Sequence, residues 1–300
     1  MARKRKTAPR LRRLRDVEVA RRALFAAAVP YLGMVRAPRS PLRDRPLEAV
    51  FSVATYNVHR WSGLTGGNRF EPDRASRVIA ELDADLIALQ EVLRPFSAPD
   101  PLETLAEELG LHAAFVVTRV HKRGELGNAI LSRRPITGVF SLDLSVGRLE
   151  RRSAIVTELH DPWQPFSLVA THLALVDRSR HQQVRSLLEH PRLQGPVILL
   201  GDLNAWRNCK ATQALDRALP AEHHNLAWPA SFPASRPLLA LDRVYARGAR
   251  VVEVRTHASS CARRASDHLP VIARIARPPR PETAAALPRD SECSGTIVAK

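Results

Sequence analysis

Polar side chains that could carry out chemistry stand at the ends of short apolar runs along this 300-residue chain. They are Asn57, Glu91, His172, Asp202 with Asn204, Asp242, and Asp267 with His268. Their carboxylate, amide and imidazole groups can together bind a hard divalent cation and move protons. One such residue alone is usually a turn former, a helix cap or a structural histidine. Their recurrence at strand tips, where a fixed backbone opens onto solvent, indicates an active site.

The elements that must position these residues are mostly short strands. Apolar runs that favour strands are FSVATYNV, DLIALQEV, LHAAFVVT, GNAILS, SAIVTEL, FSLVATHL, PVILLGDLN, LDRVYA and HLPVIARI. Helical periodicity appears in DRASRVIAELD, PLETLAEELG and DRSRHQQVRSLLEH, and Asp73 is the expected N-cap of the first. Strands outnumber helices, and several strands follow one another directly. We therefore predict an α/β (α+β) fold, a four-layer α/β/β/α sandwich of two mixed sheets packed face to face with helices outside.

The formal net charge of +16 suggests a nucleic-acid binder until the charges are located along the chain. Residues 1–45 carry a net +11, residues 277–300 carry +1, and residues 46–276 carry only +4. We therefore expect three parts. Residues 1–45 form a basic extension, disordered or with a short helix broken at Pro30. Residues 46–276 form the catalytic domain, and residues 277–300 form a Pro-rich disordered tail.

Two interpretations of the basic extension stay open. It could hold an anionic membrane surface or nucleic acid, or it could be a loosely docked arm without a ligand. A signal peptide has part of this pattern, but Asp16 and Glu18 interrupt the long basic region, and no clean cleavage site follows.

No apolar run reaches the roughly 18 to 20 residues of a membrane span. Three widely spaced cysteines argue against a disulfide framework and against a zinc knuckle. We expect a cytoplasmic location, with peripheral membrane attachment as the alternative, and no obligate protein partner.

Seven short motifs occur along the chain in the order in which a known family has them. They are TYNVH (55–59), LQEV (89–92), GNAILSR (127–133), THL (171–173), GDLN (201–204), LDRVYA (241–246) and SDHLP (266–270). Over roughly residues 50–276 the chain resembles the endonuclease/exonuclease/phosphatase superfamily of metal-dependent phosphohydrolases, which are type I deoxyribonuclease-like. Segments such as TYNVHRWSG and SFPASRPLLALDRVYA resemble a largely uncharacterised bacterial clade. Some members of that clade are associated with phospholipid synthesis genes.

The resemblance implies a metal centre. Glu91 would be the principal ligand of Mg²⁺, with Mn²⁺ as a common substitute. Asn57 and Asp267 would lie beside it as further ligands or water-mediated contacts. The chemistry agrees, because a hard divalent cation prefers carboxylate, amide and water oxygens, and the absence of a Cys or His cluster argues against zinc.

The resemblance also implies catalytic roles. Asp202 would accept the proton of the attacking water, while Asn204 would donate to a phosphate oxygen or orient that water. His268 would donate to the oxygen that gains charge in the transition state. Asp242 would fix the tautomer of His268 and favour its charged form. His172 would contact the phosphate or assist the leaving oxygen.

Two further residues are expected to bind the substrate. Asn128 follows the glycine of GNAILSR at the expected start of a strand, where a turn asparagine is an equally good interpretation. Arg152 is one of 46 basic residues and is taken from the basic patch RLERR (148–152).

Three functions remain open at this point. A phosphodiesterase acting on a small or lipid-linked phosphate is favoured by the nearly neutral body and by the resemblance to the bacterial clade. A DNA or RNA nuclease is the alternative, although duplex-binding enzymes usually line their cleft with many basic residues. A non-catalytic adaptor for nucleic acid or membrane is remote, because none of the residues expected at the site has been lost.

Overall fold

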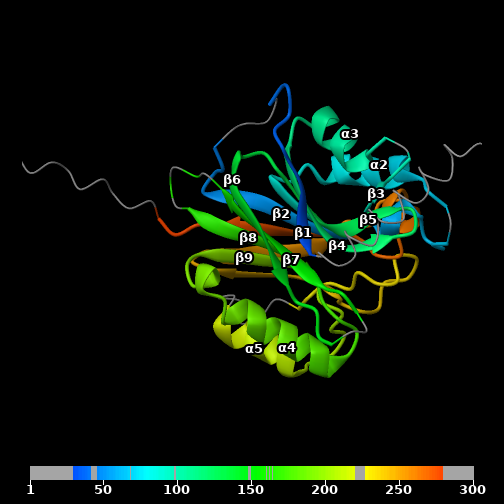
Figure 1. Cartoon of the computed structure of the whole chain (residues 1–300). Helices are drawn as coiled ribbons and strands as arrows, with labels where there is room; N and C mark the ends of the chain where they lie inside the picture. The colour runs from blue at the N-terminus through cyan, green and yellow to red at the C-terminus, as the bar shows by residue number, and fades with distance from the viewer. Residues whose placement is uncertain are drawn as a thin grey trace, which may run out of the picture.

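The computed structural model describes residues 30–41, 46–67, 69–97, 99–147, 150–159, 161, 163, 165–219 and 227–279. Two β-sheets form its centre (Figure 1). The strands of the larger sheet are β1 (Tyr31–Arg36), β2 (Val50–Asn57), β3 (Leu86–Pro95), β4 (His112–His121), β5 (Gly124–Ser132), β11 (Arg250–Thr256) and β12 (Val271–Ala276). Their order across the sheet is β1-β4-β5-β3-β2-β12-β11. Both termini of the described chain therefore contribute to one sheet.

The smaller sheet supplies the other half of the sandwich. Its strands are β6 (Ile136–Asp143), β7 (Ser153–Leu159), β8 (Phe166–His172), β9 (Val197–Asp202) and β10 (Asp242–Arg247), in the order β10-β9-β8-β7-β6. Both sheets are mixed, since β2 pairs with β3 and β8 pairs with β9 in parallel, while their other pairs are antiparallel. A parallel pair needs a crossover, and a helix connects the strands in each case.

Helices cover the two outer faces of the sandwich. The helices are α2 (Pro72–Leu82), α3 (Pro101–Glu108), α4 (Asp177–Leu188), α5 (Lys210–Ala218) and the single turn α6 (Ala262–Ala265), with 3-10 turns η1 (His59–Trp61) and η2 (Pro191–Leu193). In Figure 1, α2 and α3 lie beyond the larger sheet, and α4 and α5 lie beyond the smaller one. The predicted four-layer sandwich is confirmed.

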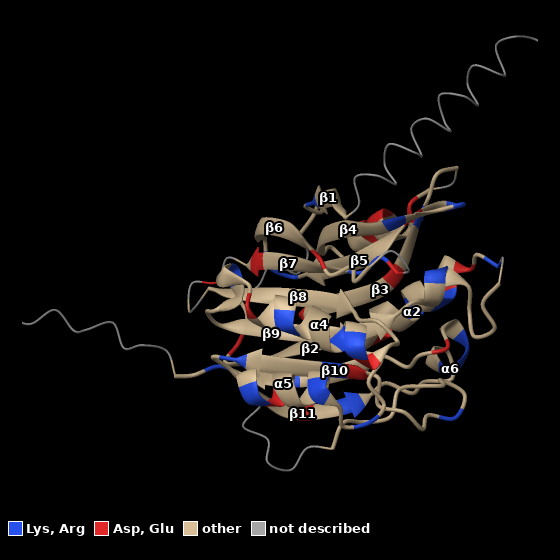
Figure 2. Ribbon diagram, turned by 60° about the horizontal axis from the view of Figure 1, so that its bottom comes forward, with Lys and Arg blue, Asp and Glu red and all other residues tan. Residues whose placement is uncertain are grey.

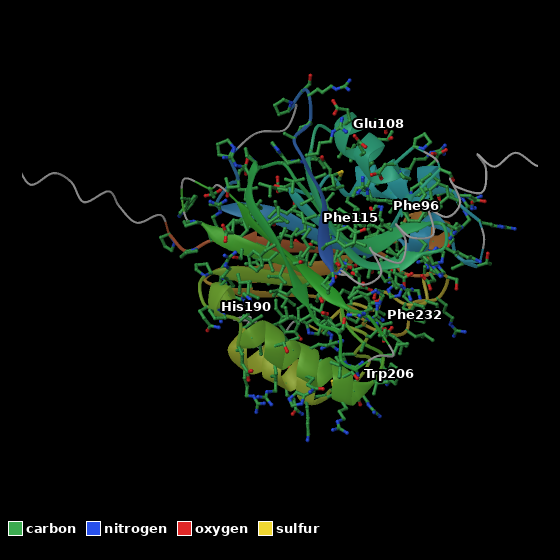
Figure 3. The ribbon with its side chains drawn as sticks, in the orientation of Figure 1. Phe96, Glu108, Phe115, His190, Trp206 and Phe232 are labelled. Atoms are coloured by element: carbon green, nitrogen blue, oxygen red, sulfur yellow. The ribbon has the colours of Figure 1, made fainter. Side chains whose placement is uncertain are left out.

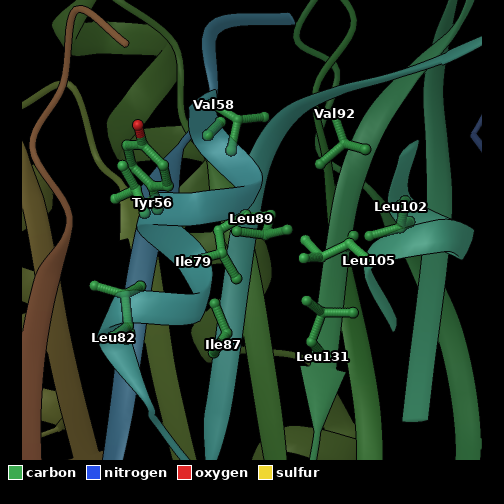
Figure 4. Packing of buried hydrophobic residues seen from close by; sticks show 14 of the residues in the cluster. Tyr56, Val58, Ile79, Leu82, Ile87, Leu89, Val92, Leu102, Leu105 and Leu131 are labelled. Atoms are coloured by element: carbon green, nitrogen blue, oxygen red, sulfur yellow. The ribbon is translucent and has the colours of Figure 1, made fainter. Parts of the chain in front are cut away.

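The alternation of side chains along each strand produces three separate layers of apolar packing. On β8, Leu168 and Ala170 belong to the core between the sheets, while Val169 between them packs under α4 and α5. On the other side, Ile79 and Leu82 of α2 pack against the larger sheet, as Figure 4 shows. Fully burying one such side chain contributes about 1.5–3 kcal/mol. The same alternation leaves the strand ends free to carry polar groups.

The predicted helix start is wrong by a short distance. Glu71 occupies the N-cap position of α2, Pro72 begins the helix, and Asp73 lies in its first turn. Proline explains this, because its fixed φ suits the first helical position and its missing N–H is not needed there. Asp73 still complements the positive end of the helix, without capping it.

The larger sheet also begins earlier than expected. Strand β1 lies inside residues 1–45, which were predicted to be an extension, and it pairs with β4 along an antiparallel register. At the other end, Arg277 donates to both carboxylate oxygens of Asp161, at 2.7 and 2.8 Å, and so is part of the folded body. The predictions for residues 1–29 and 280–300 lie outside the described residues. Within the described part of the chain, no helix is long and apolar enough to cross a membrane.

Candidate active site

Three neighbouring strands of the smaller sheet bring His172, Asp202 and Asp242 into line. The strand register pairs His172 with Asp202, and Asp202 with Asp242. Each is a terminal residue of its strand, so all three lie at the same end of the sheet. The Nε2 atom of His172 is 3.4 Å from Oδ2 of Asp202. All three side chains are buried, and Asp202 lies at the centre of the group.

The backbone around Asp202 has a conformation that only certain residues adopt. A Cβ atom at Gly201 would lie 1.9 Å from the carbonyl oxygen of Thr171, so only glycine fits there. Asn204 has a φ of 52°, a left-handed conformation that asparagine tolerates better than most residues. The N–H of Asn204 donates to Oδ1 of Asp202 at 3.0 Å, and its side-chain amide donates to the carbonyl of Leu173 at 2.9 Å. The GDLN motif therefore fixes the orientation of the Asp202 carboxylate.

His268 is held between two carboxylates. Its Nδ1 atom lies 2.8 Å from Oδ2 of Asp242, and its Nε2 atom lies 3.6 Å from Oδ2 of Asp202. The hydroxyl of Ser231 donates to the same Asp242 oxygen at 2.6 Å. The ring of Phe232 packs against the imidazole of His268, with centroids 4.9 Å apart. The ring of His268 is therefore fixed on both edges and on one face.

On the larger sheet, a β-bulge aims Glu91 toward the site. The pairing of β3 with β5 slips by one residue, so Gln90 and Glu91 together oppose Asn128. Glu91 has a φ of 51°, and bulges of this kind redirect a side chain. Asn128 therefore lies in the middle of β5, and its predicted place at the start of a strand is wrong. Its amide donates to the carbonyl of Ser153, at 2.9 Å, at the beginning of β7.

Asn57 joins the two sheets. Its Nδ2 atom donates to Oδ2 of Asp202 at 3.1 Å. Its backbone carbonyl accepts from the hydroxyl of Ser266 at 2.7 Å, which brings the following residue, Asp267, beside β2. His59 contacts both residues: its N–H donates to Oδ1 of Asn57 at 3.0 Å, and its Nδ1 lies 3.2 Å from Oδ1 of Asp267.

The segment His59–Trp61 has an unusual backbone for residues that are not glycine. Their φ angles are 47°, 57° and 60°, all in the left-handed region, which costs conformational energy. Trp61 anchors the segment, because its buried indole N–H donates to the carbonyl of Leu93 at 2.9 Å. Arg60 then lies with its Nε atom 3.3 Å from Oε2 of Glu91. The N–H donors of His59 and Arg60 therefore face the side chains of Asn57, Asp267 and Glu91.

A pocket opens between the sheets beside these residues. Glu91, Asn128, Arg152 and His172 all line it, together with Arg119 and Arg151. The site residues predicted from the sequence therefore form one connected group. Asn57, Asn204, His172 and His268 contact Asp202. Asp242 joins through His268, Asp267 joins through His59, and the other three share the pocket.

Burial and neighbouring charges shift the pKa values of Asp202, His268 and His172 in different directions. Burial raises the pKa of Asp202 to about 6, although His268 acts to lower it. Burial alone would lower the pKa of His268, but the carboxylates of Asp242 and Asp202 raise it to about 10. For His172, burial and the nearby Arg152 hold the pKa well below its usual value. Near neutral pH the site therefore combines an ionised carboxylate, an imidazolium and a neutral imidazole.

A comparison with known protein families agrees with this geometry. The sequence profile of the endonuclease/exonuclease/phosphatase family matches residues 54–268. The chain belongs to this family. It is also 30% identical, over 77% of its length, to the uncharacterized protein YbhP of Escherichia coli (strain K12), of which 98% is covered. The bacterial clade suggested by the sequence is thereby confirmed.

Solved structures of other family members have the same fold. One is an endonuclease/exonuclease/phosphatase from Beutenbergia cavernae DSM 12333, with a TM-score of 0.61 and 24% identity. It aligns over 78% of this chain and 73% of that one. Another is Danio rerio TDP2 complexed with a single-strand DNA product, with a TM-score of 0.56 and 15% identity. That alignment covers 76% of this chain and 99% of the TDP2 chain.

The oxygen donors at the site fit a hard divalent cation. Asn57, Glu91 and Asp267 offer an amide carbonyl and two carboxylates, and each of these groups already faces a positively polarised or charged partner from His59 or Arg60. Asp202, Asp242 and His268 also have ligand atoms within 4.8 Å of one another. A hydrogen bond explains why these three residues lie close together without a metal, because Nδ1 of His268 already binds Asp242. Asn57, Glu91 and Asp267 are thus a second candidate set, the one that the family resemblance implies.

Several residues that shape the site were not predicted. Arg180 is a buried residue of α4, and its Nη1 atom donates to the carbonyls of Ala174, Leu175 and Asn204 at 2.9, 3.1 and 2.7 Å. Ser231 and Arg60 likewise contact site carboxylates. Arg60 and Ser231 lie within the segments TYNVHRWSG and SFPASRPLLALDRVYA, but no role was expected for either residue. A buried arginine on the helix that follows β8 gives no periodic signal other than an interruption of the apolar face.

Proposed function

We propose that this protein is a Mg²⁺-dependent phosphodiesterase that hydrolyses a small or lipid-linked phosphodiester. The observation that supports this most is the position of Asp202, within 3.6 Å of both His172 and His268 and hydrogen-bonded to Asn57. A base and two imidazoles around one point suit in-line attack of water on phosphorus. Phosphodiesters need such help because their negative oxygens repel a nucleophile and their leaving alkoxide is poor.

Glu91, Asn57 and Asp267 would hold the Mg²⁺ ion, with Mn²⁺ as a substitute. When bound, the ion would neutralise charge on the phosphate and favour departure of the leaving oxygen. The bulge at Glu91 supports this role, since a strained left-handed residue is tolerated where its side chain must be aimed.

Asp202 would remove a proton from the attacking water. Its pKa of about 6 leaves it ionised at neutral pH yet basic enough to accept a proton. The backbone N–H of Asn204 orients the Asp202 carboxylate, while the Asn204 side chain would help to position the water or a phosphate oxygen. His268, kept charged by Asp242, would donate to the phosphate oxygen that gains charge. His172, neutral before reaction, would contact the phosphate or assist the leaving oxygen.

Arg152 and Asn128 would bind the non-reacting phosphate oxygens from the pocket wall. Arg119 and Arg151 also line this pocket. The pocket is thus locally cationic in a body whose net charge is only +4. A compact cationic pocket suits one phosphodiester, whereas tracking a duplex backbone usually takes several spaced basic contacts.

A nuclease of the same family is the alternative function. Residues Arg119–Gly124 and Cys261–Ser266 could extend the basic surface beyond the pocket, and the basic extension could add to it. The Danio rerio TDP2 structure holds a DNA product, but at 15% identity the likeness shows only the fold. A non-catalytic adaptor is remote, because a complete acid, base and amide set is retained.

A phosphoester panel tests the proposal. The purified full-length protein is assayed with Mg²⁺ on aryl phosphodiesters, phospholipids, aryl monoesters and supercoiled plasmid, with Glu91→Ala and Asp202→Ala as blanks. We expect EDTA-sensitive turnover of small or lipid diesters that both variants abolish. Plasmid nicking abolished by EDTA and Asp202→Ala, without turnover of small diesters, would instead establish the nuclease. No Mg²⁺-dependent turnover of any substrate would favour the adaptor.

A further inference from the structure

Four of the eight exposed large apolar side chains among the described residues lie in loops next to strands that end at the candidate active site. Among the described residues, the four most exposed large hydrophobic side chains are Leu238 (68%), Val176 (63%), Leu175 (59%) and Trp206 (53%). We call these four residues the apolar rim. Leu175 and Val176 follow His172 of β8, Trp206 follows Asn204 after β9, and Leu238 precedes Asp242 of β10. Exposing apolar surface at one end of the molecule is unfavourable in water, which marks it as an interaction surface.

Contacts within the molecule hold the first two loops of the rim together. A single nitrogen of Arg180 binds the carbonyls of Leu175 and Asn204, so these backbones lie side by side. Nη2 of Arg207 also donates to the Asp177 carboxylate at 2.9 Å, which links the same two loops. Figure 3 shows Trp206 at the end of the layer formed by α4 and α5. The backbones of these two loops are therefore held together, and their apolar side chains are exposed.

The third loop is tied directly to the site. The N–H of Leu238 donates to the carbonyl of Phe232 at 2.9 Å, and the ring of Phe232 lies against His268. A surface that buries Leu238 would therefore lie close to the mouth of the site.

Each rim loop also carries an exposed arginine. Arg178 follows Val176, Arg207 follows Trp206, and Arg236 precedes Leu238. The acidic residue among them, Asp177, is already paired with Arg207 and Arg180. Figure 2 shows Lys and Arg residues along α4 and α5, the helices that follow two of the rim loops. Aliphatic side chains and a tryptophan edged by arginines match the boundary between anionic headgroups and acyl chains.

We propose that the apolar rim docks the protein onto an anionic phospholipid surface, with the active site facing the headgroups. This inference rests on the proposed function and names the physical state of its substrate. Single-stranded nucleic acid fits less well, because three of the four rim residues are aliphatic and bases stack on aromatic rings. A second copy of the chain fits less well too, since a two-fold contact would bring the same arginines together.

Vesicle binding by the full-length protein tests this surface. Phosphatidylcholine vesicles with and without phosphatidylglycerol are incubated with wild type, with the double variant Leu175→Ser/Val176→Ser, and with the control Leu32→Ser/Val35→Ser. The control residues are also exposed, 47% and 50%, but lie on edge strand β1. All three proteins keep the basic extension, so any difference between them comes from the substituted side chains.

We expect the rim variant to bind phosphatidylglycerol vesicles about tenfold more weakly than wild type, and the β1 control to bind like wild type. Turnover of phospholipid in vesicles should fall by a similar factor, while turnover of a water-soluble aryl diester should not change. Trp206 fluorescence should shift to shorter wavelength on vesicle binding, and Trp206→Phe should remove that shift.

Four outcomes decide the matter. Equal vesicle binding by wild type and the rim variant would overturn the docking surface and leave only the basic extension as a membrane contact. Quenching of Trp206 by a single-stranded oligonucleotide but not by vesicles would overturn it in favour of nucleic acid. Dimerisation lost only in the rim variant would identify a second copy as the occupant. Rim-dependent vesicle binding without turnover of any phosphodiester would support the docking surface and refute the proposed hydrolase.

Discussion

Nδ1 of His268 lies 2.8 Å from Oδ2 of Asp242, and both side chains are buried at the centre of the site. This pair determines the charge of the imidazole that faces Asp202. We predict that Asp242→Asn lowers the pKa of His268 strongly, because a neutral amide cannot stabilise the imidazolium. Phosphodiesterase kcat should fall about 10²-fold or more, the usual size for a lost proton donor.

The pKa of His268 is measured by proton NMR of its ring, and kcat is measured on an aryl diester. Ser231→Ala is the matched control, because it removes the other hydrogen bond to Asp242 but keeps the carboxylate. It should retain a high His268 pKa and lose less than about tenfold in kcat. A normal wild-type His268 pKa would refute the charge assigned to this imidazole.

The same pair predicts how stability changes with pH in the metal-free protein. The pKa of His268 is about 10 when folded, and about 6.5 for an unperturbed histidine in the unfolded chain. The folded state holds the proton more tightly, so this stabilisation is complete below pH of about 6.5 and is lost as pH rises through about 10. The raised pKa of Asp202, about 6, stabilises below pH of about 4, and that effect is already lost near pH 6. Above pH of about 6.5, His268 therefore still contributes to the pH dependence of stability, whereas Asp202 no longer does.

Urea unfolding in EDTA across that window, for wild type and His268→Gln, measures this contribution. The free-energy difference between the two proteins should shrink steadily toward pH of about 10. A constant difference would mean that His268 does not titrate in this range.

Magnesium should stabilise the protein through Glu91. A ligand at 100 times its Kd raises the free energy of unfolding by about 2.7 kcal/mol. We predict a Mg²⁺-dependent rise in Tm for wild type that EDTA reverses and that Glu91→Gln abolishes. Glu91→Gln keeps the bulge and the size of the side chain but removes the charge. The same Mg²⁺ response in wild type and Glu91→Gln would remove Glu91 from the metal centre.

The sequence predicts the central strands well because they are buried on both faces. The strands that it missed, β1, β6 and β11, all lie at sheet edges. Their residues are mostly half-exposed, so they lack a continuous apolar run. The pairing partner determines such strands, and a partner far along the chain leaves no local signal.

The site residues likewise differ in whether local sequence or tertiary contacts determine them. A carboxylate or imidazole at a strand tip is visible as a residue type at the end of an apolar run. The bulge at Glu91, the left-handed turn at Arg60 and the carbonyl cluster around Arg180 arise only when separate segments pack together. Residue type was therefore enough to find the chemical groups, but their orientation depends on tertiary contacts.

Arg60 should weaken metal binding. Its guanidinium lies 3.3 Å from the Glu91 carboxylate, where it competes with a cation for the same charge. A partly exposed ion pair contributes about 0.2–1 kcal/mol, so Arg60→Gln should tighten Mn²⁺ binding by a factor of about 1.4 to 5. Electron paramagnetic resonance measures free Mn²⁺ directly. Arg133→Gln is the control, since Arg133 pairs with Asp83 and Asp85 and not with site residues. Weaker Mn²⁺ binding by Arg60→Gln would mean that Arg60 supports the metal centre.

Arg180 should couple stability to catalysis as a positioning residue. It is buried, and it binds three carbonyls, including that of Asn204, and the Asp177 side chain. Arg180→Met keeps the bulk of the side chain but leaves buried carbonyls without a donor, which should cost about 3–5 kcal/mol. Because the turn at Asn204 would then shift, kcat should fall while KM for an aryl diester changes little. Arg185→Met on the exposed face of α4 should stay within about 0.5 kcal/mol of wild type. Denaturant unfolding gives both stabilities, and a variant Arg180→Met with lower stability but unchanged kcat would show that Arg180 supports the fold alone.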